Sequence, residues 1–305
     1  MEKLSCEELI KLFVEDLNLR QRSRDTVKLY PIIVRAFCRS INGRVLELTK
    51  DDLRAYLNEL IARKFKKSSI VKHFVVLNSF YDFLYDSDIY PFNPIPSFRK
   101  RYLSFYNPRS TEGKRRCPTT EEASRLVNSI LKPRDQAIVI LLFKTGIRRK
   151  ELSELDASDV DMANRTIILK RTAKRSNRKV FFDEEAAYVL NRWLKRREVL
   201  NKKGNPALFI GQSGDRLTLR PINVMFNGYA KTAGLTNGEK IEEKLTPHCC
   251  RHFFTNELLE AGMPREHIQF LRGDRGKEAI DIYHHINEKK LQEEYEKYIP
   301  QLGVL

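Results

Sequence analysis

Residues 245–262, "LTPHCCRHFFTNELLEAG", contain two histidines, two cysteines and an arginine within five consecutive positions. Thr246 followed by Pro247 is typical of the N-cap and the first position of a helix. His248 and Arg251 are three residues apart, so they share one face of the first turn, beside the backbone N–H groups and the positive end of the helix dipole. The stretch therefore predicts a helix whose first turn can bind a phosphate group.

The two cysteines in this stretch are also a candidate metal site or thiol nucleophile. Zinc sites usually take two cysteines from a C-x₂₋₄-C pair, whereas Cys249 and Cys250 are adjacent and point about 100° apart on a helix. The sequence contains no second ligand pair at a recognisable spacing and no Asp or Asn motif that would orient a histidine against either thiol. We therefore expect apolar packing for both cysteines, and neither a metal nor a cofactor.

Length and charge restrict the class of protein. The chain has 305 residues, of which 41% are hydrophobic, enough for two domains with a core each. Lys and Arg number 56 against 40 Asp and Glu, a formal charge of +16, and such a surface attracts polyanions. Nucleic acid is the leading expected partner, although charge alone also fits a protein whose basic faces are only solvated.

The sequence contains no segment typical of secretion or membrane insertion. Its first ten residues, "MEKLSCEELI", are charged where a signal peptide is apolar, and the longest apolar run, residues 137–143, is far shorter than the roughly 20 residues of a membrane span. Five cysteines without regular spacing suit reduced thiols. We expect a cytoplasmic protein with no membrane association.

The first 98 residues predict a domain of four helices. Ser5 with Glu8 and Thr49 with Asp52 have capping-box spacing, and each pair precedes a run of apolar residues at helical spacing. The segment between them is also periodic but contains Pro31, which should kink that helix or delay its start. A fourth periodic run is expected to supply core residues: Ile70, Phe74, Leu77, Phe80 and Leu84.

The rest of the chain predicts a linker and a second domain. The proline-rich stretch "YPFNPIP" is expected to end the first unit, and residues 99–116 hold seven Lys or Arg and one acid, which indicates a basic linker. In residues 117–305 a buried helix near 134–144 is followed by two extended runs, "RTIILK" and "KVFF", around a polar turn. The expected fold class is mainly α with a small antiparallel β-sheet.

Two further motifs accompany the His-x-x-Arg pair. "TGIRRKEL" lies about a hundred residues upstream, and "LRGDRGKEAIDIYHHI" lies about thirty residues downstream. The order Arg, His-x-x-Arg, Tyr resembles the tyrosine recombinase family of phage integrases, Cre-like enzymes and Xer-type resolvases, and the resemblance covers nearly the whole chain. It implies a two-domain clamp around duplex DNA, with residues 1–98 as the helical core-binding domain, 99–116 as the linker and 117–305 as the catalytic domain.

The resemblance also implies the site residues. Glu151 matches the acidic residue that supports the first arginine, and Asp274 departs from the pattern, because the family usually has His or Trp there. The matching catalytic positions are Arg148, Lys174, His248, Arg251, Asp274 and Tyr283. Basic residues of the linker and hairpin are expected to bind DNA phosphates: Arg115, Arg116, Arg175, Arg178 and Lys179.

The implied reaction is cleavage and rejoining of a phosphodiester. Arg148 and Arg251 would stabilise charge on the nonbridging oxygens. Tyr283 would attack phosphorus to give a 3′-phosphotyrosyl link, Lys174 would protonate the leaving 5′-oxygen, and His248 would assist proton transfer or donate to the phosphate. No metal is required, because the fixed arginines supply the positive charge, and no ATP is required, because the tyrosyl link keeps the bond energy for rejoining.

The implied function is site-specific recombination of double-stranded DNA at a specific recombination site. The enzyme would act as a homo-tetramer on two duplexes, be a monomer or weak oligomer when free, and lie in the cytoplasm with the nucleoid. Two alternatives stay open: a catalytically inactive, integrase-derived DNA-binding protein, supported by Asp274, and an enzyme like type IB topoisomerases.

The C-terminal segment has two expected arrangements. Leu291, Tyr295, Tyr298 and Ile299 share one helical face. That face can fold back onto the chain's own core, or, as the resemblance implies, a C-terminal helix can be exchanged with the next protomer.

Overall fold

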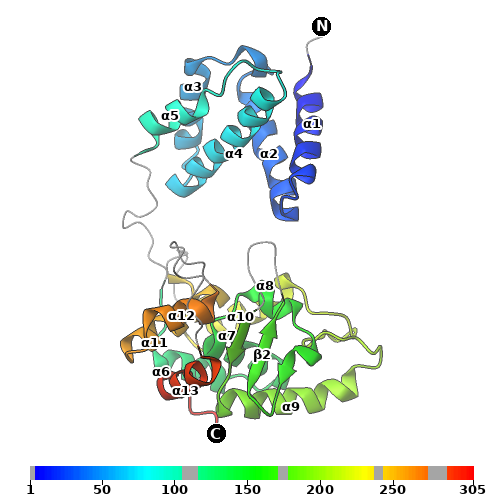
Figure 1. The fold of residues 1–305 in the computed structure, drawn as a ribbon, viewed down its shortest axis with the longest axis vertical. Helices are drawn as coiled ribbons and strands as arrows, with labels where there is room; N and C mark the ends of the chain where they lie inside the picture. Colours follow the sequence, from blue (N-terminus) through cyan, green and yellow to red (C-terminus); the bar gives the residue numbers. More distant parts are fainter. Residues whose placement is uncertain (1–3, 105–115, 171–177, 237–242, 274–286) are drawn as a thin grey trace. The chain divides into compact units, whose positions relative to one another are not determined.

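The computed structural model describes residues 4–104, 116–170, 178–236, 243–273 and 287–305. The chain divides into two compact units, Met1–Glu112 and Gly113–Leu305 (Figure 1). Within the described residues, no helix combines the length and hydropathy that a membrane span requires. Each unit has its own hydrophobic core and is described by itself.

In the part of the first unit that the structure describes, all regular structure is helical. Its helices are α1 (Cys6–Leu19), α2 (Arg24–Ser40), α3 (Lys50–Ala62), α4 (Lys67–Asp86) and α5 (Ile95–Tyr102), with a 3₁₀ turn at Val45–Glu47. The capping boxes expected at Ser5 and Thr49 are both formed. Pro31 lies inside α2, so the helix does not start late.

Helix α4 contacts the other helices of the first unit and supplies more buried core residues than any of them. All five residues of the expected stripe are buried, as predicted. Beyond it, Phe98 of α5 stacks on Phe74 with ring centroids 5.3 Å apart. The basic stretch expected as a linker, residues 99–116, therefore begins inside α5. Pro96 does not prevent this helix, because proline is compatible with the first turn of a helix.

The second unit is mostly helical and contains one small sheet, which confirms the predicted fold class. The strands are β1 (Val160–Asp161), β2 (Thr166–Leu169) and β3 (Arg178–Phe181), and they form an antiparallel sheet in the order β1-β2-β3. Ile167 pairs with Val160 on one side and with Val180 on the other. The helices are α6 (Thr120–Asn128), α7 (Pro133–Thr145), α8 (Arg149–Glu154), α9 (Glu184–Leu200), α10 (Leu219–Thr232), α11 (Pro247–Glu260), α12 (Arg265–Arg272) and α13 (Glu288–Tyr298).

Helix α7 is the centre of the second unit. It is buried from Asp135 to Thr145 and packs against α9 and α11. It ends at Gly146, whose φ of +59° favours glycine and whose Cβ, if present, would lie 2.5 Å from a ring atom of Phe254. This close approach of α11 to the end of α7 places Arg148 near the first turn of α11.

The C-terminal segment folds back onto its own unit. Leu291, Tyr295 and Ile299 are buried in a cluster with side chains of β3, α11 and α12. The Tyr295 hydroxyl donates to the Lys144 carbonyl oxygen at 2.9 Å. Of the two expected arrangements, the structure therefore contains the packing of α13 within its own chain.

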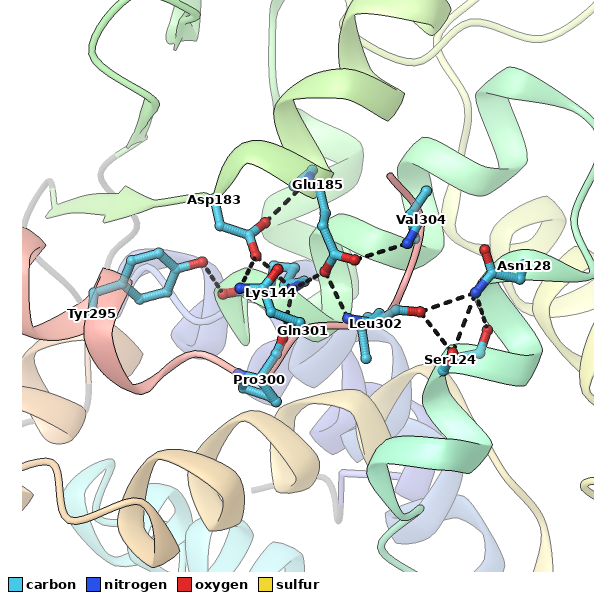
Figure 2. Close-up of polar contacts among 11 residues, drawn as sticks. Ser124, Asn128, Lys144, Asp183, Glu185, Tyr295, Pro300, Gln301, Leu302 and Val304 are labelled. Carbon is cyan, nitrogen blue, oxygen red and sulfur yellow. Dashed lines mark hydrogen bonds and ion pairs between the residues drawn. The ribbon is translucent and has the colours of Figure 1, made fainter.

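The residues after α13 close a buried ionic cluster (Figure 2). The Lys144 ammonium group donates to carboxylate oxygens of Asp183 at 2.5 Å and Glu185 at 2.6 Å, and to the Pro300 carbonyl at 2.6 Å. The Glu185 carboxylate also accepts the backbone N–H of Leu302 at 2.7 Å and of Val304 at 2.8 Å. The buried charges of this cluster thus have hydrogen-bond partners within the protein.

Candidate active site

A pocket of about 370 Å³ lies between the first turns of α8 and α11. Arg148, His248 and Arg251 line it together. Its other lining residues come from α8, α10, the start of α11 and the segments next to these helices: Ile147, Arg149, Lys150, Leu219, Asn223, Asn227, Thr246 and Pro247. The structure therefore brings three of the sequence-predicted residues to one cationic pocket.

The two cysteines at the start of α11 are buried. Helix α11 begins at Pro247 after the N-cap Thr246, as expected, and the Thr246 backbone N–H and hydroxyl both lie 3.4 Å from the Cys249 sulfur. Cys249 and Cys250 are buried in the core of the unit, and burial raises the pKa of the Cys250 thiol. Among the described residues no group of three or more His, Cys, Asp or Glu side chains is placed to share a metal ion.

Arg251 is held by backbone carbonyls from two helix ends. The residue is 4% exposed, and its Nη1 donates to the Gly146 carbonyl at 2.7 Å while its Nη2 donates to the Arg272 carbonyl at 2.8 Å. Arg148 Nη1 reaches the same Arg272 oxygen at 3.4 Å. Both guanidinium groups therefore converge on the last residue of α12.

The Glu151 carboxylate contacts two arginines, Arg148 and Arg178. Its Oε2 accepts the Arg148 backbone N–H at 2.7 Å, and its Oε1 is 3.5 Å from Arg148 Nη1. Two N–H groups of Arg178 bind the two carboxylate oxygens, each at 3.0 Å. Burial alone would raise the pKa of Glu151, but the hydrogen bonds and charge of Arg178, followed by those of Arg148, outweigh it and lower the pKa. The carboxylate is therefore ionised at neutral pH.

Arg178 does not lie on the surface, in contrast to its expected place among the DNA-binding residues. It is 8% exposed, and its Nε donates to the Leu271 carbonyl at 3.1 Å in addition to the two bonds to Glu151. Arg178 and Val180 lie on one face of β3, and Lys179 and Phe181 lie on the other. Arg178 is enclosed by Glu151 and the end of α12, whereas the side chain of Lys179 is 34% exposed. Nothing in the basic composition of the hairpin distinguishes this arginine from its neighbours.

The other expected site residues differ in how far the structure describes them. Lys179 forms an ion pair with Glu288 at 2.6 Å, and Arg116 binds the Leu235 carbonyl and Glu122. Five expected positions lie outside the described residues: Arg115, Lys174, Arg175, Asp274 and Tyr283.

Comparison with known proteins identifies the family. Residues 118–290 match the phage integrase family, and residues 9–90 match the N-terminal SAM-like domain of phage integrases. Tyrosine recombinase XerC of Oceanobacillus iheyensis is 29% identical over 96% of both chains, and that of Pediococcus pentosaceus is 30% identical over 96% of this chain and 98% of the relative.

Solved structures show the same fold. The Tn1549 transposon integrase in complex with transposon right end DNA has a TM-score of 0.69 at 21% identity, covering 96% of this chain and 99% of that one. The predicted resemblance is therefore confirmed by two family models that together span both units and by relatives similar over nearly the full length. The chain belongs to the phage integrase family, the DNA strand-transferring enzymes named tyrosine recombinases.

Proposed function

We propose that this protein is a site-specific recombinase that cleaves and rejoins duplex DNA through a 3′-phosphotyrosyl intermediate, in integration, excision or resolution. The observation that carries the proposal is the convergence of Arg148, His248 and Arg251 on one pocket at a helix start. Cationic and N–H donors gathered in this way suit a phosphodiester, whose anionic oxygens gain further charge as a nucleophile attacks. The net charge of +16 supports a polyanionic substrate.

The two arginines would stabilise the transition state. Arg148 and Arg251 present planar, forked donors to nonbridging oxygens, and one such donor is commonly worth about 10²–10³ in rate. Glu151 orients Arg148 through its backbone N–H and its guanidinium. His248, in the first turn of α11, donates to the phosphate or assists proton transfer.

The covalent step is assigned on the family motif. Tyr283 Oη gives up its proton, with His248 assisting the transfer, and forms a bond to phosphorus while the bond from phosphorus to the 5′-oxygen breaks. Lys174 supplies the proton to that oxygen. Attack by a 5′-hydroxyl on the phosphotyrosyl link reverses the step, so that the bond is conserved without a nucleoside triphosphate. Asp274, where the family usually has a donor, would act through a neighbouring side chain.

The partner would be duplex DNA with a specific recombination site. Residues 1–98 and 117–305 are the proposed DNA-binding and catalytic domains of a clamp, and a homo-tetramer on two duplexes is the proposed active assembly. Among relatives of the same fold, the Tn1549 integrase structure is a complex with transposon DNA. Phosphate contacts are proposed for Arg115, Arg116, Arg175 and Lys179, and not for the buried Arg178.

The test is covalent trapping. Duplexes bound by the wild-type protein are first selected from a pool of random sequence, and nicked versions of them are then incubated with protein and resolved under denaturing conditions. The wild type should give a protein–DNA adduct, insensitive to EDTA, and Tyr283→Phe should bind but give none. The control is Tyr188→Phe, at a 47% exposed tyrosine of α9, which should form adduct normally.

Two results would replace the proposal. If the wild type binds DNA but gives no adduct on any selected duplex, the protein is an inactive DNA-binding relative. If it forms adduct and relaxes supercoiled DNA but does not exchange strands between two duplexes, it acts as a topoisomerase.

A further inference from the structure

We infer that Arg178 is a positioning residue of the cleavage reaction, an inference that rests on the proposed function. Its buried guanidinium connects Glu151 of α8 to the C-terminal end of α12. In this place it sets the geometry of Arg148 and of the Arg272 carbonyl, which both pocket arginines contact. It does not itself contact DNA in this assignment.

Three separate elements meet at the Arg178 side chain. The residue belongs to β3, its forked N–H groups bind Glu151 of α8, and its Nε binds the Leu271 carbonyl of α12. A planar fork is needed for this arrangement, because lysine has a single point charge and cannot bind both carboxylate oxygens and the carbonyl in fixed directions. Arg178 therefore fixes α8 and α12 relative to each other.

The backbone after α12 fits closely against the same guanidinium. Gly273 has a φ of +60°, and a Cβ there would lie 2.7 Å from Arg178 Nη1 and 2.8 Å from its Cδ. The end of α12 thus contacts Arg178 through both the Leu271 carbonyl and Gly273. Residues 274–286, which include Tyr283, follow directly in the sequence.

The distances around Glu151 indicate a second effect, on charge. Arg178 binds the carboxylate with two contacts of 3.0 Å, whereas the closest side-chain contact from Arg148 is 3.5 Å. Between these two arginines, Arg178 therefore makes the shorter contacts with the carboxylate, while Glu151 orients Arg148 through its backbone N–H and a longer contact with its guanidinium. Without Arg178, the buried carboxylate should form its close ion pair with Arg148 instead, and so weaken the hold of Arg148 on a phosphate.

This competition predicts rescue by a second substitution. Arg178→Met should cleave about 100-fold more slowly, a loss comparable to that of a transition-state donor, with DNA affinity changed much less. Glu151→Gln in that background removes the carboxylate that captures Arg148, while the amide oxygen can still accept the Arg148 backbone N–H. The double variant should therefore cleave about tenfold faster than Arg178→Met alone.

Arg197 offers a matched control. It is 9% exposed against 8% for Arg178, and it donates to the backbone carbonyls of Ala207 at 2.8 Å and Asn205 at 2.6 Å, neither of which lines the pocket. Arg197→Met should lose thermal stability as Arg178→Met does, yet keep cleavage near the wild-type rate. Arg178→Lys, which keeps a cation, should be intermediate and provides a second variant if the methionine variant does not fold.

Single-turnover cleavage of the nicked, selected duplex, DNA affinity and melting temperature are measured for each variant below its melting transition. The inference is supported if cleavage falls selectively in the Arg178 variants and the Glu151→Gln substitution restores part of it. It is overturned if an Arg178 variant cleaves like Arg197→Met, or if the double variant is no faster than Arg178→Met. A wild-type protein that forms no adduct would instead reject the proposed function, and this inference with it.

Discussion

Two buried ionic clusters contact the C-terminal end of α7, and they differ in composition and access. In the first, Lys144 faces the carboxylates of Asp183 and Glu185, and the residues after α13 cover it (Figure 2). In the second, within the part of the chain that the structure describes, Glu151 forms ion pairs with Arg148 and Arg178, and the side chain of Arg148 is 33% exposed at the pocket. The difference indicates that the first cluster stabilises the fold, whereas the second borders a pocket lined by Arg148, His248 and Arg251.

A single short segment connects the two clusters. The Lys144 carbonyl accepts the Tyr295 hydroxyl, and two residues later the Gly146 carbonyl accepts Arg251. The same helix end therefore anchors both the C-terminal segment and a pocket arginine. Substitutions can separate stability from cleavage only if they affect one cluster at a time.

The largest expected effect is on stability. Lys144→Met should lower the free energy of unfolding by about 3–5 kcal/mol, because it leaves two buried carboxylates without their cation. Urea unfolding measures the change, with Lys150→Met as control, since that side chain is 64% exposed and its ion pair with Glu154 is 3.8 Å long. A loss no greater than that of the control would mean that the first cluster does not hold the unit together.

The next effect is on cleavage. Arg251→Ala should reduce the single-turnover rate by about 10²–10³-fold, because a forked donor to the phosphate is lost. Lys144→Met, measured at a temperature at which it is folded, should remain within about threefold of the wild-type rate. Equal losses in the two variants would show that the clusters act as one functional unit.

The smallest effect concerns pH. Burial alone would raise the pKa of Glu185, but the bond from Lys144 and the backbone N–H groups of Leu302 and Val304 outweigh it and lower the pKa. A carboxyl whose folded pKa is lowered contributes stability above its usual value of 4.5, and this contribution is lost as the pH falls through the folded pKa. Wild-type stability should therefore decline below that pH, and more steeply than in Glu185→Gln. An identical pH dependence in both proteins would contradict this role of Glu185.

Much of the molecule follows from local sequence signals. Capping at Ser5, Thr49 and Thr246, the apolar stripe of α4 and the buried α7 depend on residues within a few positions of one another, so the sequence predicts them directly. The order Arg, His-x-x-Arg, Tyr likewise indicates the family from the sequence alone. These features require no knowledge of which distant segments meet.

Other features depend on contacts between distant segments. Phe98 of α5 packs on Phe74 of α4, although the sequence also fitted a linker from residue 99 onward. Tyr295 of α13 binds the end of α7, although the sequence also fitted exchange of this helix with another protomer. Arg148 and Arg251 both bind the carbonyl of Arg272. Every residue has such a backbone group, so the sequence does not indicate which carbonyl the two arginines bind.

The hairpin shows most clearly what the sequence determined and what it left open. Composition alone predicts a basic hairpin, because residues 162–182 include seven Lys or Arg and no acid. It does not predict which basic side chain is buried, since a shift of one residue in the register would exchange the faces of Arg178 and Lys179. Tertiary structure decided this. Arg178 pairs with Leu169 in the sheet, and Glu151 and the end of α12 enclose its side chain, so that Arg178 is an internal ion-pair partner. Lys179, one residue on, instead pairs with Glu288 outside the core.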